Sequence, residues 1–236
     1  MARFDTTSWS LILRAASNDD AEARLALALL CEHYWYPVYA YIRCQGVSPA
    51  DAEDLAQGYF ARFLEKGVVR DVDRDRGRFR SFLLASVRHF LANERDRERA
   101  SKRGGGHRLV SLDAELAEER YASMPVDQLT PERQFERNWT LALLERAHER
   151  LAQEAARRGA GDRFARLRPY LAGDEPEAAY DAIAREWGTG QSAVRVALHR
   201  LRRRFGEVLR EEIGRTVDSP EDVDDELRGA LKLLGA

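Results

Sequence analysis

The sequence predicts an all-α protein with two helical domains joined by a flexible linker, the C-terminal one a helix-turn-helix. Three observations lead to this fold class. Nearly every apolar pattern has the period of an α-helix, and no segment alternates convincingly between apolar and polar residues as a strand does. Glycines and proline-containing breaks interrupt the helical pattern within residues 101–133. The block after this interruption ends in a short helix, a glycine-containing turn and a strongly basic helix.

Composition places the 236-residue chain among soluble globular proteins. Apolar residues make up 44% and charged residues 33% of it, and no apolar run approaches the length of a membrane span. The first ten residues, MARFDTTSWS, contain no hydrophobic signal segment, so we expect a cytoplasmic location and no membrane contact. Cys31 and Cys44 have no second Cys/His pair nearby, which favours small buried thiols over a disulfide or a zinc site.

Charge is unevenly distributed along the chain, although the formal net charge is only −2. Between Arg76 and Arg108 ten Lys/Arg residues stand against three acidic ones, and residues 188–206 contain five arginines and no acid. The acids gather elsewhere, above all in the segment DSPEDVDDE near the C-terminus. Two separate basic patches indicate a nucleic-acid partner more clearly than the net charge does.

The first domain is expected over residues 8–100 and consists of four predicted helices. They run from about residue 8 to 16, from 20 to 44, from Pro49 to 65 and from 81 to 99. Pro37 is expected to kink the second of them, because proline removes a backbone donor within a helix.

The third of these helices, which contains DAEDLAQGYFARFLE, has an unusual outer face. Ser48 and Asp51 have the spacing of a capping box, and Pro49 suits the first helical position. The inward stripe is expected to consist of Ala52, Leu55, Ala56, Tyr59 and Phe63. The opposite face consists of Asp54, Gln57, Gly58 and Ala61. Glycine within a helix costs about 1 kcal/mol relative to alanine. The residues alone leave open whether this smooth face binds a partner or is an ordinary exposed surface.

Residues 101–133 are expected to form the linker, in which LDAELAEERYA is compatible with a short helix. The second helical domain is predicted over residues 134–215, with a helix beginning near Pro131. An acidic tail is expected over residues 216–236. The tail has no assigned role, and its acidic segment DVDDE motivates the hypothesis that it covers a basic surface.

The segment AAYDAIAREWGTGQSAVRVALHRLRRRF carries the most specific pattern. Its short first helix has an apolar face, GTG forms a tight turn, and Thr189 is placed to cap the second helix. This second helix is expected to bury Val194, Ala197, Leu198, Leu201 and Phe205. A helix of this kind fits the major groove, where its N-terminal residues reach base edges and later arginines reach phosphates. The candidate DNA-binding residues are Gln191, Ser192, Arg195, Val196, His199, Arg200, Arg202 and Arg203. The alternative is that RLRRRF is merely a solvated helix surface.

The order of these elements resembles the extracytoplasmic-function type of bacterial RNA polymerase sigma factor, within the sigma-70 family. The resemblance rests on DAEDLAQGYFARFLE, then FRSFLLASVRHFLANERDRERASKR, a linker and a C-terminal helix-turn-helix. It implies a subunit without enzymatic activity that recruits core RNA polymerase to particular promoters. The implied partners are core RNA polymerase, promoter DNA and a regulatory protein such as an anti-sigma factor. No cofactor is implied.

The resemblance also implies which residues of the first domain bind each partner. The family motif D-A-E-D-L-x-Q-x-x-F docks on the polymerase clamp helices. Here the implied polymerase-binding residues are Asp51, Asp54, Leu55, Gln57, Gly58, Phe60 and Ala61. The next helix handles the minus-ten promoter element, which implies Arg78, Arg80, Arg88, Asn93, Arg95 and Arg97. Phe79 and Phe82 either stack on opened bases or belong to the core, and their helical spacing favours the core. The C-terminal helix-turn-helix would read the minus-thirty-five element.

Two other interpretations compete with this one. A helix-turn-helix regulator would bind duplex DNA without contacting the polymerase core, its first domain serving dimerisation or ligand sensing. A nucleic-acid-processing enzyme would need a metal or catalytic cluster, and the five scattered histidines suggest none. The segment DVDRDRG departs from a calcium loop because Phe82 stands at the twelfth position, and KRGGGHR lacks the nucleotide-loop pattern.

Overall fold

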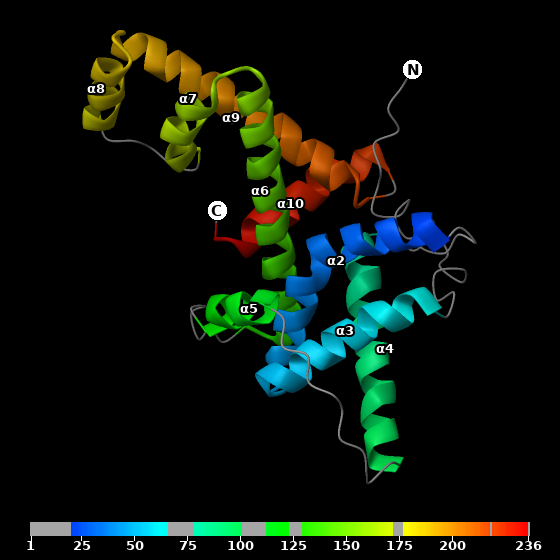
Figure 1. Cartoon of the computed structure of the whole chain (residues 1–236). Helices are drawn as coiled ribbons and strands as arrows, with labels where there is room; N and C mark the ends of the chain where they lie inside the picture. Colours follow the sequence, from blue (N-terminus) through cyan, green and yellow to red (C-terminus); the bar gives the residue numbers. More distant parts are fainter. Residues whose placement is uncertain are drawn as a thin grey trace. The chain divides into compact units, whose positions relative to one another are not determined.

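The computed structural model describes residues 20–65, 78–100, 112–122, 129–171, 177–217 and 219–235. Within these ranges the protein contains nine α-helices, two short 3-10 helices (Arg168–Tyr170 and Pro220–Asp222) and no strand, which confirms the all-α prediction. Figure 1 shows the α-helices, which are α2 (Asp20–Arg43), α3 (Pro49–Glu65), α4 (Phe79–Ala100), α5 (Leu112–Ala122), α6 (Pro131–Arg157), α7 (Gly161–Leu167), α8 (Glu177–Glu186), α9 (Gln191–Gly214) and α10 (Val223–Leu233). None of the described helices is long and apolar enough to cross a membrane.

The chain divides into two compact units. The first comprises residues 1–142 and 214–236, and the second comprises residues 143–213. The described parts of the predicted linker and of the predicted tail therefore belong to the first unit, and α6 contributes to both units. The helix predicted at residues 8–16 lies outside the described residues.

The core of the first unit is built around an aromatic cluster from α2, α4 and α6. The rings of Tyr34 and Trp139 stack with their centroids 4.5 Å apart, and Phe79 lies 5.1 Å from Tyr34 and 5.5 Å from Trp139. All three side chains are buried, so Phe79 is a core residue and does not present its ring for base stacking. Burial of such large apolar surfaces holds the first part of α6 in this unit.

Helix α3 begins and packs as its sequence indicates. The Asp51 N–H donates to the Ser48 hydroxyl at 3.2 Å, and that hydroxyl donates to the Asp51 carboxylate at 2.6 Å, as a cap of this kind requires. Ala52, Ala56 and Tyr59 are buried, which confirms the inward stripe at these positions.

The short helix α5 is fastened to α2 by charged and polar contacts. Arg43 donates two hydrogen bonds to the Glu118 carboxylate, at 2.7 and 2.8 Å, and the Tyr39 hydroxyl donates a third at 2.5 Å. A bidentate arginine–carboxylate pair is directional as well as strong. The helix expected within the predicted linker is thus present and anchored.

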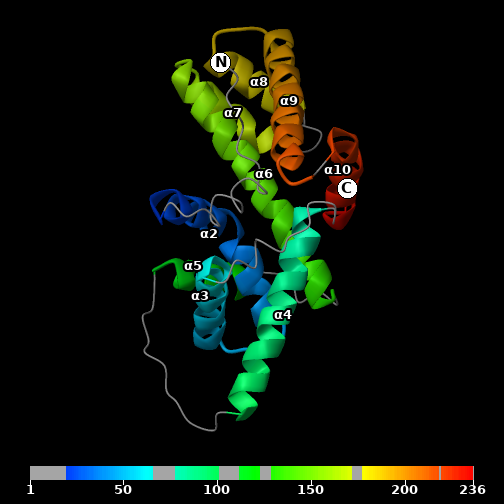
Figure 2. The same cartoon turned by 90° about the vertical axis from the view of Figure 1, so that its right-hand side faces the viewer.

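The acidic tail ends in a helix that packs within the first unit. A 3-10 helix, Pro220–Asp222, leads into α10. The Ser219 hydroxyl caps it by accepting from the Glu221 N–H at 3.2 Å. In α10, Glu226 and Ala230 are buried. Figure 2 shows α10 beside the N-terminal end of α4.

The second unit packs α7, α8 and α9 around a small apolar core. Its fully or nearly buried members are Leu167, Ile183, Ala184, Val194 and Leu198. Tyr180 of α8 and Trp187, the residue after α8, pack against them. The helical spacing of these positions predicted the inner faces of both α8 and α9 correctly.

Candidate nucleic-acid interface

The turn between α8 and α9 is fixed by backbone hydrogen bonds and by one glycine. The Trp187 N–H donates to the Ile183 carbonyl at 3.0 Å, and the Thr189 N–H donates to the Ala184 carbonyl at 2.9 Å. Between them Gly188 has φ of +62°, a left-handed conformation that glycine adopts without steric cost. Helix α9 begins at Gln191, so Gly190 rather than Thr189 directly precedes it.

The outer face of α9 is polar, basic and accessible. Val194 and Leu198 point into the core of the second unit, whereas Arg195 and Val196 between them turn outward. The exposed members of the predicted DNA-binding set are Ser192, Arg195, Val196, His199, Arg200 and Arg203. The Arg195 guanidinium lies 4.8 Å from the centre of the Tyr180 ring, a cation–π contact that orients it. Val196 is 48% exposed, which leaves an apolar contact point among the charges.

Two residues of the predicted DNA-binding set differ from the expected exposure. Arg202 is half-buried and donates from Nε and Nη2 to the Tyr170 carbonyl, at 3.2 and 2.9 Å. Gln191 is half-buried and its amide donates to the Asp181 carboxylate. Arg202 therefore fixes α9 to the preceding 3-10 turn, and the basic outer face is smaller than the arginine count suggests.

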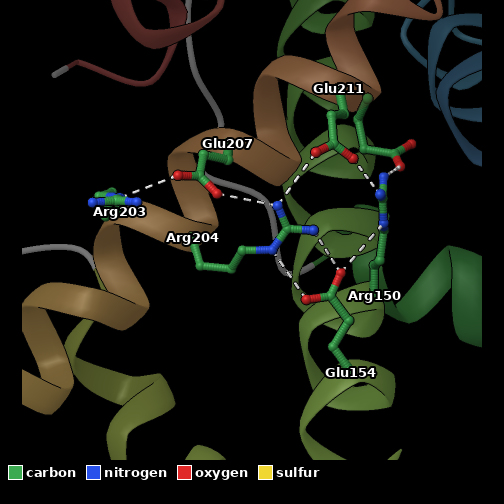
Figure 3. A network of polar contacts seen from close by, with 7 residues as sticks. Arg150, Glu154, Arg203, Arg204, Glu207 and Glu211 are labelled. Carbon is green, nitrogen blue, oxygen red and sulfur yellow. Dashed lines mark hydrogen bonds and ion pairs between the residues drawn. The ribbon is translucent and has the colours of Figure 1, made fainter.

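A network of acidic and basic side chains fastens α9 to the second part of α6 (Figure 3). Its centre is Arg204, which donates to the two oxygens of Glu154 at 2.7 and 3.0 Å. Arg204 also pairs with Glu207 at 3.2 Å and with Glu211 at 3.3 Å. Arg150 pairs in turn with Glu154 at 3.8 Å and with Glu211. All these residues belong to the second unit, where they set the position of α9.

The protonation of Glu154 depends on this network. Its hydrogen bonds with Arg204 hold the pKa of the carboxyl below its ordinary value, against the opposite effect of burial. A lowered folded-state pKa means that ionised Glu154 stabilises the fold above the unfolded-state value. That contribution is lost as the pH falls through the lowered pKa. The network is therefore intact at neutral pH.

Helix α4 carries a second basic surface from Arg88 onward. Arg88, Asn93, Arg95 and Arg97, four of the residues that the resemblance implies for promoter DNA, are exposed. Arg95 donates to the Gln45 amide oxygen at 2.5 Å, and Arg97 pairs with Glu94 at 2.6 Å. A pocket of about 250 Å³ opens beside this surface. It is lined by Tyr41, Gln45, Arg88, Leu91, Arg95, Pro131 and Glu132.

The N-terminal end of α4 differs from the predicted basic surface. Arg80 is buried, and its Nε lies 2.9 Å from the Glu226 carboxylate. The Arg78 Nε lies 3.0 Å from the same carboxylate, and its side chain is partly exposed. The pairing with a C-terminal carboxylate could not be read from the sequence, because the partners are more than a hundred residues apart. In this conformation Arg80 is not available to a ligand. Phe82 is half-buried, and its ring lies 6.2 Å from that of Phe79.

The outer face of α3 is smooth but narrower than predicted. Asp51, Asp54, Gln57 and Ala61 are exposed, and Leu55 is half-buried. Phe60 is only 3% exposed and packs edge-on against Tyr59, so it is a core residue rather than a surface contact. A Cβ added to Gly58 would lie 3.6 Å from the Phe90 ring, so this glycine faces α4. Gln57 donates to the buried Glu53 carboxylate at 3.0 Å. Four positions of the predicted polymerase-binding set therefore remain accessible.

The remaining features are the ones for which the sequence favoured no metal, disulfide or nucleotide site. Both cysteines are free and partly buried, and burial raises the pKa of the Cys31 thiol to about 11. Within the described ranges no three His, Cys, Asp or Glu side chains are grouped to hold a metal ion. The calcium-like segment 71–77 and the glycine-rich segment 102–108 lie outside the described residues.

Compared with models of protein families, with curated proteins and with solved structures, the chain matches none.

Proposed function

We propose that α8, the turn at Gly188 and α9 form a helix-turn-helix that binds duplex DNA. The observation that carries this proposal is the accessible basic face of α9, with Arg195, Arg200 and Arg203 exposed together. A buried apolar face and a fixed turn hold that surface on a rigid helix, which suits insertion into the major groove. Ser192 and Val196 lie near the N-terminal end of α9, where base edges would be contacted.

The chain as a whole acts, in this proposal, as a sigma factor of the extracytoplasmic-function type. The second basic surface on α4 would contact promoter DNA through Arg88, Asn93, Arg95 and Arg97. The exposed Asp54, Gln57 and Ala61 of α3 would contact the polymerase core, where a small side chain permits close approach of a partner helix. This role implies a cytoplasmic location and no enzymatic activity.

A charge reversal on α3 tests the polymerase contact. Asp54→Lys should abolish retention of the full chain by immobilised bacterial core RNA polymerase, because an exposed lysine would stand where the partner accepts a carboxylate. Glu119→Lys makes the same change at an exposed position of α5 and should leave retention unchanged. Binding of both variants to duplex DNA should equal that of the parent chain. Equal retention of both variants would reject the polymerase contact.

The second candidate function is a helix-turn-helix regulator that does not bind the polymerase core. The burial of Phe60 and the packing of Gly58 against Phe90 favour it, because they remove two positions from the predicted polymerase surface. Specific duplex binding without any retention by core polymerase would support this alternative.

A further inference from the structure

Glu226, in the first turn of α10, is buried against two arginines at the start of α4. Its side chain is 2% exposed, and its oxygens lie 2.9 Å from Arg80 Nε and 3.0 Å from Arg78 Nε. The Arg80 side chain is 9% exposed. These two arginines belong to the set that the sequence resemblance implies for promoter DNA, yet a carboxylate of the same chain pairs with both.

The surrounding backbone also holds the tail against α4. The Phe79 N–H donates to the Thr216 carbonyl at 3.0 Å, and Thr216 and Val217 are buried. A Cβ added to Gly229 would lie 3.9 Å from Arg80 Nη2, so the backbone of α10 passes close to that guanidinium. The cover over Arg80 is therefore a docked helix rather than a single side chain.

Acidic side chains of α6 extend this cover along α4. Glu136 Oε1 lies 4.0 Å from Arg80 Nη1. Further along α4, Glu132 lines the same pocket as Arg88 and Arg95. Acidic residues of two other helices, α10 and α6, thus lie near arginines of α4.

The contact at Glu226 fits an exchangeable ion pair. Burial raises the pKa of the Glu226 carboxyl, and the charges of Arg80 and Arg78 oppose that effect. Arg80 Nε lies at ion-pair distance from Glu226 Oε1, and Arg78 Nε from Glu226 Oε2. Neither Arg80 Nε nor Glu226 Oε2, however, has a partner in hydrogen-bond geometry. A buried ion pair repays its desolvation only with excellent geometry, so this pair adds little net stability. A phosphate offers the same arginines charge-assisted hydrogen bonds.

We propose that α10 competes with promoter DNA for α4: Glu226 holds Arg78 and Arg80 until DNA displaces it. This inference rests on the proposed function, since it assigns a regulator to the same DNA-binding surface. The free chain binds DNA through the accessible arginines, and release of α10 adds Arg78 and Arg80. The free energy needed to displace α10 therefore lowers the affinity of the intact chain for DNA.

The test compares two full-length variants that remove the same charge. Glu226→Gln removes the carboxylate charge over Arg78 and Arg80, and Asp225→Asn removes one at an exposed neighbouring position. Binding to a fluorescent oligonucleotide with a partly opened duplex is measured by anisotropy. Glu226→Gln should bind about tenfold more tightly, the gain expected when the competent fraction rises from about 0.1 towards 1. Asp225→Asn should match the parent chain.

A third variant separates release of Arg80 from a general change in charge. In an Arg80→Gln background, Glu226→Gln should give much less gain, because the released guanidinium is then absent. Equal affinities of the parent chain and Glu226→Gln would overturn the inference and leave the proposed function standing. Failure of the parent chain and every variant to bind DNA would overturn both.

Hydrogen exchange on the unchanged full chain gives a readout that needs no substitution. Addition of the oligonucleotide should lower the protection of amides in α10 and raise it in α4. Unchanged protection of α10 with DNA bound would overturn the inference even if Glu226→Gln failed to fold.

Discussion

Three arginines in a row, at positions 202 to 204, have three different roles. Successive residues of an α-helix point about 100° apart, so neighbours with identical chemistry meet different surroundings. Arg202 donates to the Tyr170 carbonyl, Arg203 reaches solvent with 78% of its side chain exposed, and Arg204 enters an acidic network at 31% exposure. One of the three therefore remains accessible to a phosphate, while the other two position the helix that carries it.

Replacement of Arg204 should destabilise the second unit, whereas replacement of Arg203 should not. Arg204→Ala leaves the partly buried Glu154 without its main partner and should lower the free energy of unfolding by about 1–3 kcal/mol. Arg203→Ala breaks an exposed pair with Glu207 and should change it by less than about 0.5 kcal/mol. Urea denaturation of both variants measures the difference. Equal losses would show that the network does not fasten α9.

At the scale of residues, the sequence predicted which side chains point inward or outward better than it predicted their bonding partners. Helical periodicity placed Val194 and Leu198 inside and Arg195 outside, as the structure has them. It could not predict that Arg202 bonds to a carbonyl 32 positions earlier, since such a pairing depends on tertiary packing. The burial of Phe60 was not predicted for the same reason, because it depends on how α3 packs in the first unit.

At the scale of elements, local signals placed the starts of α3 and α6, whereas Thr189, the predicted cap of α9, does not directly precede that helix. The Ser48 cap places the start of α3, and Pro131 is the first residue of α6. The acidic segment DVDDE motivated the hypothesis of a cover over a basic surface, but the sequence did not predict the helix α10 that contains its last residues. Its Glu226 pairs with Arg78 and Arg80, which lie far away in the chain. No local signal identifies these two arginines as its partners.

The turn between α8 and α9 gives a prediction at this scale. Gly188→Ala forces an L-residue into the left-handed region, which should destabilise the second unit by about 1–2 kcal/mol although a Cβ there meets no atom within 4 Å. Gly161→Ala is the matched control, because its Cβ also meets no atom within 4 Å and its φ lies outside the left-handed region. Thermal unfolding followed by circular dichroism compares the two. An unaltered midpoint for Gly188→Ala would show that the turn tolerates another conformation.

For the whole molecule, the charge available to a partner depends on which charged side chains remain exposed. The formal net charge of −2 counts all charged residues equally, yet Glu154 and Glu226 form ion pairs with arginines within the protein. The division into two units depends likewise on distant contacts. Trp139 stacks on Tyr34, which places the start of the predicted second domain in the first unit. Glu118 binds Arg43, which places part of the predicted linker there as well. Composition and periodicity cannot predict such contacts, because the partners lie far apart in the sequence.

The proposed DNA interface predicts how binding depends on salt. If Arg195, Arg200 and Arg203 each neutralise one phosphate, the slope of log K against log salt concentration should include about −2.7 from α9, at about −0.9 per contact. Arg200→Ala should therefore make the slope shallower by about 0.9 and weaken binding to all sequences alike. Arg157→Ala removes another exposed charge, at the end of α6, and should leave the slope unchanged. Anisotropy titrations of duplex DNA at several salt concentrations measure these slopes. A slope that Arg200→Ala leaves unaltered would exclude this face of α9 from phosphate contact, however tightly the parent chain binds.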